Sequence, residues 1–201
     1  NDNDYKQLLF LLKKSANNLL LSSGLLFLLI NLNLIDFYNW VNLTAYTKAI
    51  DVVLIISFGK LFSMSMGCLN NIITNSKYYH YVFWFSIASA ILAVILNIFF
   101  IKLYGIIGAA YATLIVIVFI NLMKILLVQL TFNMNPFGKK TILTILVIFI
   151  VYLLSSNINF DFSPFISIIL RSLFIGVIFT LTSHMLKLTS DFQSFFIKLF
   201  S

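Results

Sequence analysis

Three cationic side chains lie inside long apolar stretches of this 201-residue chain, and their positions suggest chemistry. They are Lys60, Lys124 and Arg171. A charged group that faces lipid near the middle of a membrane span costs at least about 2.5 to 3.5 kcal/mol, so it should face protein or a watery cavity. Three embedded cations with no acidic residue deep in the same stretches suit a substrate that carries phosphate.

The apolar stretch 50–74 has the most regular polar pattern. Its small and polar residues recur every three or four positions, which places them on one helical face: Ser57, Lys60, Ser63, Gly67, Asn70, Asn71 and Thr74. Two interpretations of Lys60 stay open. It lines a cavity for an anionic substrate group, or it snorkels or bonds to asparagine and only joins helices. Lys124 and Arg171 lie nearer to the ends of their stretches, where snorkelling is the favoured interpretation.

Small residues mark predicted helix contacts. Gly105 and Ala109, and likewise Gly108 and Ala112, form two pairs spaced by four, and Gly67 lies on the polar face of 50–74. Such spacing lets helix backbones approach closely in a membrane. We therefore interpret these residues as packing positions, and expect leucine at position 108 to impair folding.

Composition and hydropathy determine the class. The chain is 61% hydrophobic and 9% charged, with a mean hydropathy of +1.04, whereas soluble domains average about 25% charged residues. The continuous apolar stretches are too long for barrel strands and long enough for membrane helices: 19–35, 50–74, 79–101, 106–130, 141–156 and 164–186. The sequence predicts an all-helical, polytopic bundle with about six transmembrane helices.

Basic residues are distributed unevenly between the two sides of this predicted bundle. With six spans, one side carries Lys6, Lys13, Lys14, Lys77, Lys139, Lys140, Lys187 and Lys198, and the other carries Lys48 and Lys102. Positive residues concentrate on the cytoplasmic side of membrane proteins. Both termini are therefore predicted to be cytoplasmic, with residues 1–18 as an interfacial linker and 187–201 as a tail. No basic cluster exceeds two adjacent residues, so a nucleic-acid partner is not expected.

Several kinds of chemistry have no residues to support them. Cys68 is the single cysteine, there is no glutamate, and no phosphate-binding loop or carboxylate pair is present. We expect no metal, no cofactor and no enzymatic activity. The chain begins at Asn1 within a polar stretch, from which we expect a fragment of a longer protein.

Three runs resemble a known family: NNIITNSK at 70–77, LNIFFI at 96–101 and KLYGIIGAAYAT at 102–113. With the Asn135-Pro136-Phe137 turn, they resemble the carboxy-terminal half of polysaccharide-biosynthesis flippases of the O-antigen type. These belong to the multidrug/oligosaccharidyl-lipid/polysaccharide exporter superfamily. The resemblance is clearest over about residues 60–140 and carries no catalytic motif.

The resemblance implies a two-lobed, alternating-access transporter in the inner membrane. Residues 19–130 would supply four helices of the second lobe, and residues 131–186 would supply a loop and two additional helices. A missing amino-terminal half of the same chain would supply the other lobe. The implied substrate is an oligosaccharide linked to undecaprenyl diphosphate. Lys60 would line the path of its headgroup, and Asn70, Asn71 and Asn97 would offer hydrogen bonds to sugars. Lys124 and Arg171 remain further candidates for this path.

Two alternatives stay open. A cation-coupled multidrug antiporter of the same superfamily needs buried carboxylates, which would have to lie in the missing half. A membrane polysaccharide polymerase or ligase needs a large extracytoplasmic loop with arginine, histidine or acidic residues. The longest predicted outer loop, about 36–49, is short, and its only charged residues are Asp36 and Lys48.

Overall fold

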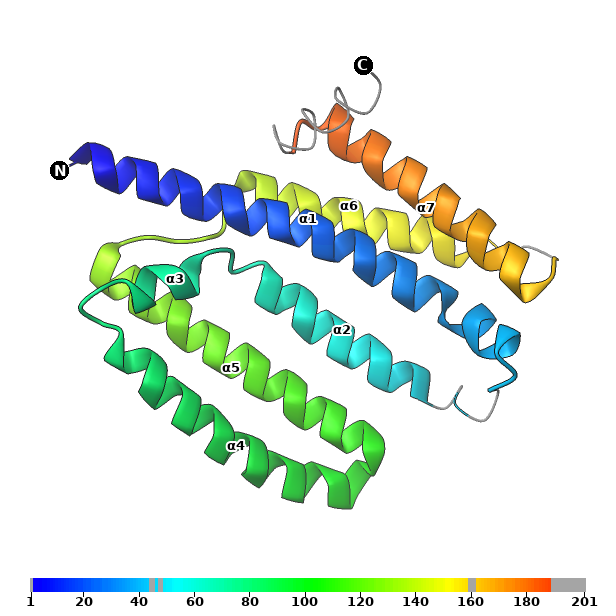
Figure 1. Ribbon diagram of the computed structural model, residues 1–201, viewed down its shortest axis with the longest axis horizontal. Coiled ribbons are helices and arrows are strands. Elements are labelled where there is room, and N and C mark those ends of the chain that lie inside the picture. The colour runs from blue at the N-terminus through cyan, green and yellow to red at the C-terminus, as the bar shows by residue number, and fades with distance from the viewer. Residues whose placement is uncertain (1, 44–45, 47–48, 159–161, 189–201) are drawn as a thin grey trace.

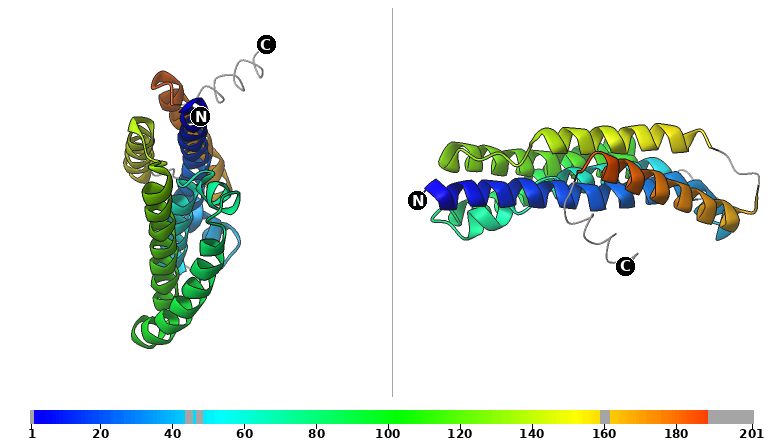
Figure 2. Two further views of the ribbon diagram at one scale, coloured as in Figure 1. Left: turned by 90° about the vertical axis from the view of Figure 1, so that its left-hand side faces the viewer. Right: turned by 90° about the horizontal axis from the view of Figure 1, so that it is seen from above.

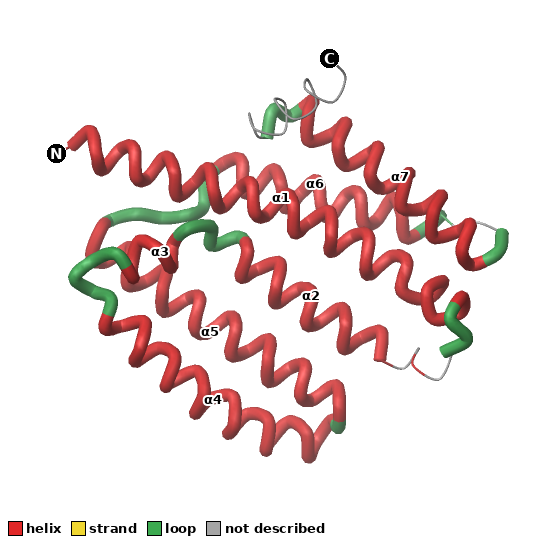
Figure 3. Tube along the Cα trace, in the orientation of Figure 1, coloured by secondary structure: helices red, strands yellow, loops and turns green. Residues whose placement is uncertain are grey.

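The computed structural model describes residues 2–43, 46, 49–158 and 162–188, and within them all regular structure is helical (Figures 1 and 3). The helices are α1 (Asp2–Trp40), α2 (Ile50–Met64), α3 (Leu69–Thr74), α4 (His80–Tyr104), α5 (Ile106–Phe132), α6 (Lys139–Ser156) and α7 (Pro164–Met185). The prediction of an all-helical, polytopic membrane bundle is confirmed. Helices are the natural outcome because they satisfy their own backbone hydrogen bonds where lipid offers none.

Five helices, not six, are long and apolar enough to span a membrane in the described part of the chain: α1, α4, α5, α6 and α7. The predicted span 50–74 is broken into α2 and α3. Gly67 has a φ of +61°, and a Cβ there would lie 2.5 Å from the backbone nitrogen of Ala16. The break therefore lets the chain turn against α1, and the Cys68 N–H donates to Ser15 Oγ across this contact at 3.0 Å.

Helix α1 contains the first predicted span and most of the residues that precede it. Residues 2–18, expected to be an interfacial linker, continue into the first span as one 39-residue helix. Leu12 and Ala16 in this part have no exposed surface, and the Tyr5 hydroxyl donates to the Asn133 carbonyl at 2.9 Å. This part of α1 thus packs against the bundle through Tyr5, Leu12 and Ala16. Of the predicted tail 187–201, residues 189–201 lie outside the described residues.

The other helices pack around two long ones, α1 and α5 (Figures 1 and 2). Helix α1 contacts α2, α6 and α7, whereas α5 contacts α2, α3 and α4. One apolar core joins α1, α6 and α7 around Leu28, Ile148 and Phe179. A second core joins α1, α3 and α5 around Leu12, Leu69 and Val128. Helix α4 has no buried residue and packs mainly along α5.

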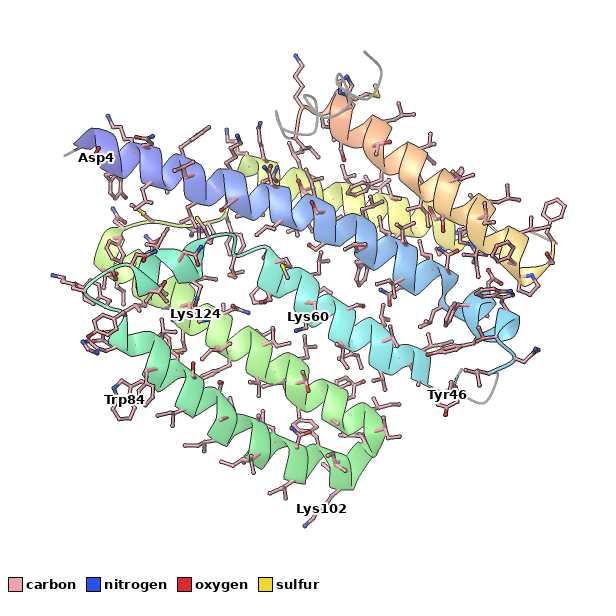
Figure 4. All side chains as sticks on the ribbon, viewed as in Figure 1. Asp4, Tyr46, Lys60, Trp84, Lys102 and Lys124 are labelled. Atoms are coloured by element: carbon pink, nitrogen blue, oxygen red, sulfur yellow. The ribbon has the colours of Figure 1, made fainter. Side chains whose placement is uncertain are left out.

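Successive long helices run in opposite directions, which collects most described lysines at one end of the bundle (Figure 1). This basic end contains the amino-terminal part of α1, the α3–α4 turn and the start of α6, and Lys187 joins it because the Lys140 ammonium donates to the Lys187 carbonyl at 3.1 Å. Lys102 lies at the other end (Figure 4). Lys48 and Lys198 lie outside the described residues.

Candidate functional site

Lys60 lies on an exposed part of α2. The preceding Gly59 packs against α5, where an added Cβ would be 3.3 Å from side-chain atoms of both Leu114 and Ile117. Consecutive helical residues are rotated by about 100°, so Lys60 projects beside this contact. Figure 4 shows it on the side of α2 that faces α5. Among the residues described, the Lys60 ammonium has no hydrogen-bond or ion-pair partner.

Lys124 is half-buried on α5 and belongs to the same pair of helices. Helices α2 and α5 run in the same direction (Figure 1), and Gly59 lies beside Ile117. Lys124 follows Ile117 by seven residues, and so lies about 10 Å further along the bundle than Lys60. The structure therefore brings these two candidates onto neighbouring helices. We call Lys60 and Lys124 the lysine track.

The three candidate asparagines do not form one cluster. Asn70 and Asn71 are exposed on the short helix α3, whereas Asn97 is partly buried near the far end of α4. Asn97 lies seventeen residues after His80, the first residue of α4, which corresponds to about 25 Å along that helix. Its Nδ2 donates to the Ala93 carbonyl at 2.7 Å, within α4 itself. The structure therefore places Asn97 apart from Asn70 and Asn71, and their predicted role in binding sugars stays a prediction.

Arg171 is anchored by three groups from other segments. Its Nη1 donates to the Asp36 carboxylate at 2.5 Å and to the Leu32 carbonyl at 2.8 Å, and its Nη2 donates to the Ile158 carbonyl at 3.2 Å. The exposed fractions of the Arg171 and Asp36 side chains are only 11% and 20%. Charge-assisted bonds of this kind are stronger than neutral ones, so this guanidinium joins α7 to α1 and to the end of α6.

The packing candidates behave in two different ways. A Cβ at Gly108 would overlap the Phe100 carbonyl of α4, and Ala112 is fully buried, so both lie at close helix contacts. Gly105 has no atom within 4 Å of an added Cβ, but its φ of +60° allows the tight turn between α4 and α5. Ala109 is only partly buried, and its neighbour Ala110 is the more buried residue.

An apolar groove of about 450 Å³ opens between α1, α2, α5 and α6. Its lining is aromatic and aliphatic, and it is formed by Phe27, Leu54, Ile55, Phe58, Leu61, Leu114, Ile145, Ile148, Phe149 and Tyr152. Phe58 and Lys60 differ by two positions, or about 200° around α2, so the groove and Lys60 lie on nearly opposite faces of that helix. A groove with this lining fits a hydrocarbon chain rather than a polar headgroup.

Three asparagines of α1 that were not among the predicted site residues bond to other helices. Asn17 accepts a bond from Thr144 of α6 at 2.8 Å, Asn31 donates to Ser57 of α2 at 2.9 Å, and Asn33 donates to Ser172 of α7 at 3.1 Å. Amide and hydroxyl side chains commonly join helices in membranes. For Asn31 and Asn33 the available signal was an amide inside the apolar stretch 19–35, whereas Asn17 precedes that stretch; the partners of all three are 26 to 139 residues away in sequence.

The fold and these contacts define a helical membrane protein with several spans. Across the described residues, no group of three or more His, Cys, Asp or Glu side chains is placed to hold a metal ion. No protein-family model, curated protein or solved structure matches the chain. The flippase resemblance therefore stays a prediction.

Proposed function

We propose that this chain forms part of a flippase that moves oligosaccharides linked to a lipid diphosphate, of the undecaprenyl type, across the inner membrane for surface polysaccharide synthesis. The observation that carries the proposal is the lysine track. A charged group at membrane depth needs a partner or water, and Lys60 is exposed with no partner in the part of the chain described. A passing diphosphate, in a cavity completed by another lobe, would supply the missing negative charge.

The apolar groove supports the lipid part of the proposal. Transport of a lipid-linked sugar requires a polar path for the headgroup and an apolar surface for the hydrocarbon chain. The two faces of α2 offer one of each, with Lys60 on one face and Phe58 in the groove on the other. We further propose that the basic end of the bundle is cytoplasmic, because the described lysines there outnumber those at the opposite end.

The alternative of a cation-coupled antiporter has less support. Coupling to protons or sodium requires a carboxylate that is free to bind the ion. Within the described spans, the Asp36 carboxylate is bonded to Arg171, and Asp51 is exposed at the first turn of α2. A polymerase or ligase is also less favoured, because the described outer connections, such as the turn at Gly105, are short.

Flipping measured in the full-length protein tests the proposal. Lys60→Ala and Lys124→Ala are each expected to reduce the flipping rate by about tenfold, the effect of losing roughly 1.4 kcal/mol of charge stabilisation. Lys60→Arg is expected to retain most activity, because it keeps the charge. Lys102→Ala at the other end of the bundle is the matched control. Unchanged flipping by Lys60→Ala, at equal membrane levels, would overturn the assigned role of the lysine track.

A further inference from the structure

A second cationic feature, separate from the lysine track, lies at the basic end of the bundle. It is a pocket of about 350 Å³ between α1 and the start of α6. Four lysines line it together with three uncharged polar residues: Lys13, Lys14, Asn17, Asn18, Lys139, Lys140 and Thr141. None of the described residues that line this basic pocket is acidic. The ammonium groups of Lys13, Lys139 and Lys140 repel one another around this small volume, and a bound anion would relieve that repulsion.

Bonds between distant segments hold the walls of the basic pocket in place. Asn17 is 4% exposed; its Nδ2 donates to the Leu188 carbonyl at 2.9 Å, and its Oδ1 accepts from Thr144 of α6 at 2.8 Å. The Lys140 ammonium donates to the Lys187 carbonyl. Bonds within the protein therefore join α1, α6 and the segment after α7 around the pocket.

The start of α6 adds to the positive character of the pocket. Gly138 precedes the helix in an extended conformation, and an added Cβ at this glycine would be 3.8 Å from Lys13 Cδ. The stem of Lys13 thus passes next to the first turn of α6. Backbone N–H groups in a first helical turn lack acceptors within the helix and attract anions.

The depth of the pocket in the membrane indicates which anion it meets. Helix α6 has 18 residues and starts at Lys139, so its length of about 27 Å nearly equals the hydrocarbon thickness of about 30 Å. Lys139 and Lys140 then lie at the boundary between hydrocarbon and headgroups. Phe10, 64% exposed at the rim, can insert into the same boundary. Phosphates of membrane lipids occupy this level, and basic pockets between membrane helices bind such headgroups.

We propose that the basic pocket binds the phosphate of an anionic phospholipid headgroup from the surrounding leaflet. The lysines of α1 and α6 surround the phosphate, and the acyl chains lie along the apolar surfaces of the same helices. This inference is independent of the flippase proposal, because it requires neither transport nor a second lobe. A soluble phosphate compound has the same charged group, so the experiment must separate the two sources.

The test is a titration of the full-length protein in non-ionic detergent with dioctanoyl phosphatidylglycerol, with the dissociation constant measured by native mass spectrometry. The double variant Lys13→Gln/Lys139→Gln removes two pocket charges and leaves Lys140 and its bond to Lys187 intact. Each lysine near an anionic headgroup contributes about fivefold to affinity, so the loss of two is expected to weaken binding by about 25-fold. The matched control Lys6→Gln/Lys77→Gln removes two charges from the same end outside the pocket, and is expected to change affinity less than about twofold.

Two further arms identify the ligand. One arm uses dioctanoyl phosphatidylcholine, which has no net charge, and the other uses inorganic phosphate at millimolar concentration. Neither should bind as tightly as phosphatidylglycerol or displace it. Displacement by inorganic phosphate would assign the pocket to a soluble anion and overturn the lipid proposal. Equal binding of phosphatidylcholine, or an equal loss in the control variant, would also overturn it. If the glutamine variant fails to fold, two measurements still decide the result. The variant Lys13→Arg/Lys139→Arg must keep its affinity for phosphatidylglycerol, and the unmodified protein must distinguish phosphatidylglycerol from the other two ligands.

Discussion

Two regions of the bundle are joined by different means. In the first, α1, α6 and α7 share an apolar core and are linked by side-chain bonds, such as Arg171 to Asp36 and Asn33 to Ser172. In the second, α4 packs along α5 without a single buried residue of its own, through the close approach of Gly108 to the Phe100 carbonyl. We call them the clamped region and the glycine-packed region.

This difference separates stability from transport in our proposal. In the clamped region, the mostly buried cation Arg171 is paired with Asp36 and serves to connect helices. Next to the glycine-packed region, Lys60 is exposed and unpaired within the described chain. A side chain that contributes little to folding is free to bind a substrate. Substitutions should therefore affect stability strongly in some places and transport in others.

The largest effect is expected at the contact between α4 and α5. Gly108→Leu would force α4 away from α5, because even the Cβ overlaps the Phe100 carbonyl. Overpacking against backbone is expected to cost about 3 kcal/mol or more. Thermal unfolding in detergent measures the loss. Gly176→Leu is the control, since no atom lies within 4 Å of a Cβ there, and a higher helix propensity should make it neutral or stabilising. Equal losses in both variants would show that close packing is not the cause.

A slightly smaller loss is expected when the clamped region loses its ion pair. Arg171→Ala leaves the Asp36 carboxylate mostly buried without its partner. Because the pair is partly exposed, the expected cost is about 2 to 3 kcal/mol of unfolding free energy, below that of a fully buried pair. The double variant Asp36→Leu/Arg171→Leu should be more stable than Arg171→Ala, because no charge is left unpaired. A double variant less stable than the single one would contradict this account.

A loss of about 0.6 to 1 kcal/mol is expected when a single amide bond in the clamped region is removed. Asn33→Ala deletes the donor to Ser172 of α7. Thermal unfolding is again the measurement, and Asn39→Ala, at an exposed position of the same helix, should leave stability within about 0.5 kcal/mol. No difference between the two variants would mean that this bond does not hold α1 and α7 together.

The smallest change in stability is expected for Lys60→Ala. The side chain is exposed and makes no bond among the described residues, so unfolding free energy should change by less than about 0.5 kcal/mol. The same variant is expected to lose flipping activity. Arg171→Ala should lose flipping activity only in proportion to the protein that fails to fold. A Lys60→Ala protein that is as unstable as Arg171→Ala would remove the distinction between the two cations.

Sequence alone predicted the features that depend on local composition. Apolar length identified the membrane class and the positions of α4, α5, α6 and α7 to within a few residues, because the cost of placing a segment in lipid is nearly a sum over its own residues. The grouping of lysines at one end followed from the alternation of spans. Gly108 was identified as a packing residue because its spacing reports on a helix face.

Tertiary structure decided the features that depend on contacts between distant segments. Arg171 and Asp36 are 135 residues apart in sequence, so their pairing follows from how α7 crosses α1 and not from the pattern of either helix. The break at Gly67 depends on the approach of Ala16, since an isolated glycine is otherwise tolerated in a helix. Two further features depend on which helices become neighbours: the separation of Asn97 from Asn70 and Asn71, and the basic pocket between α1 and α6. The choice of neighbours depends on the packing free energy of the whole bundle and not on any one segment.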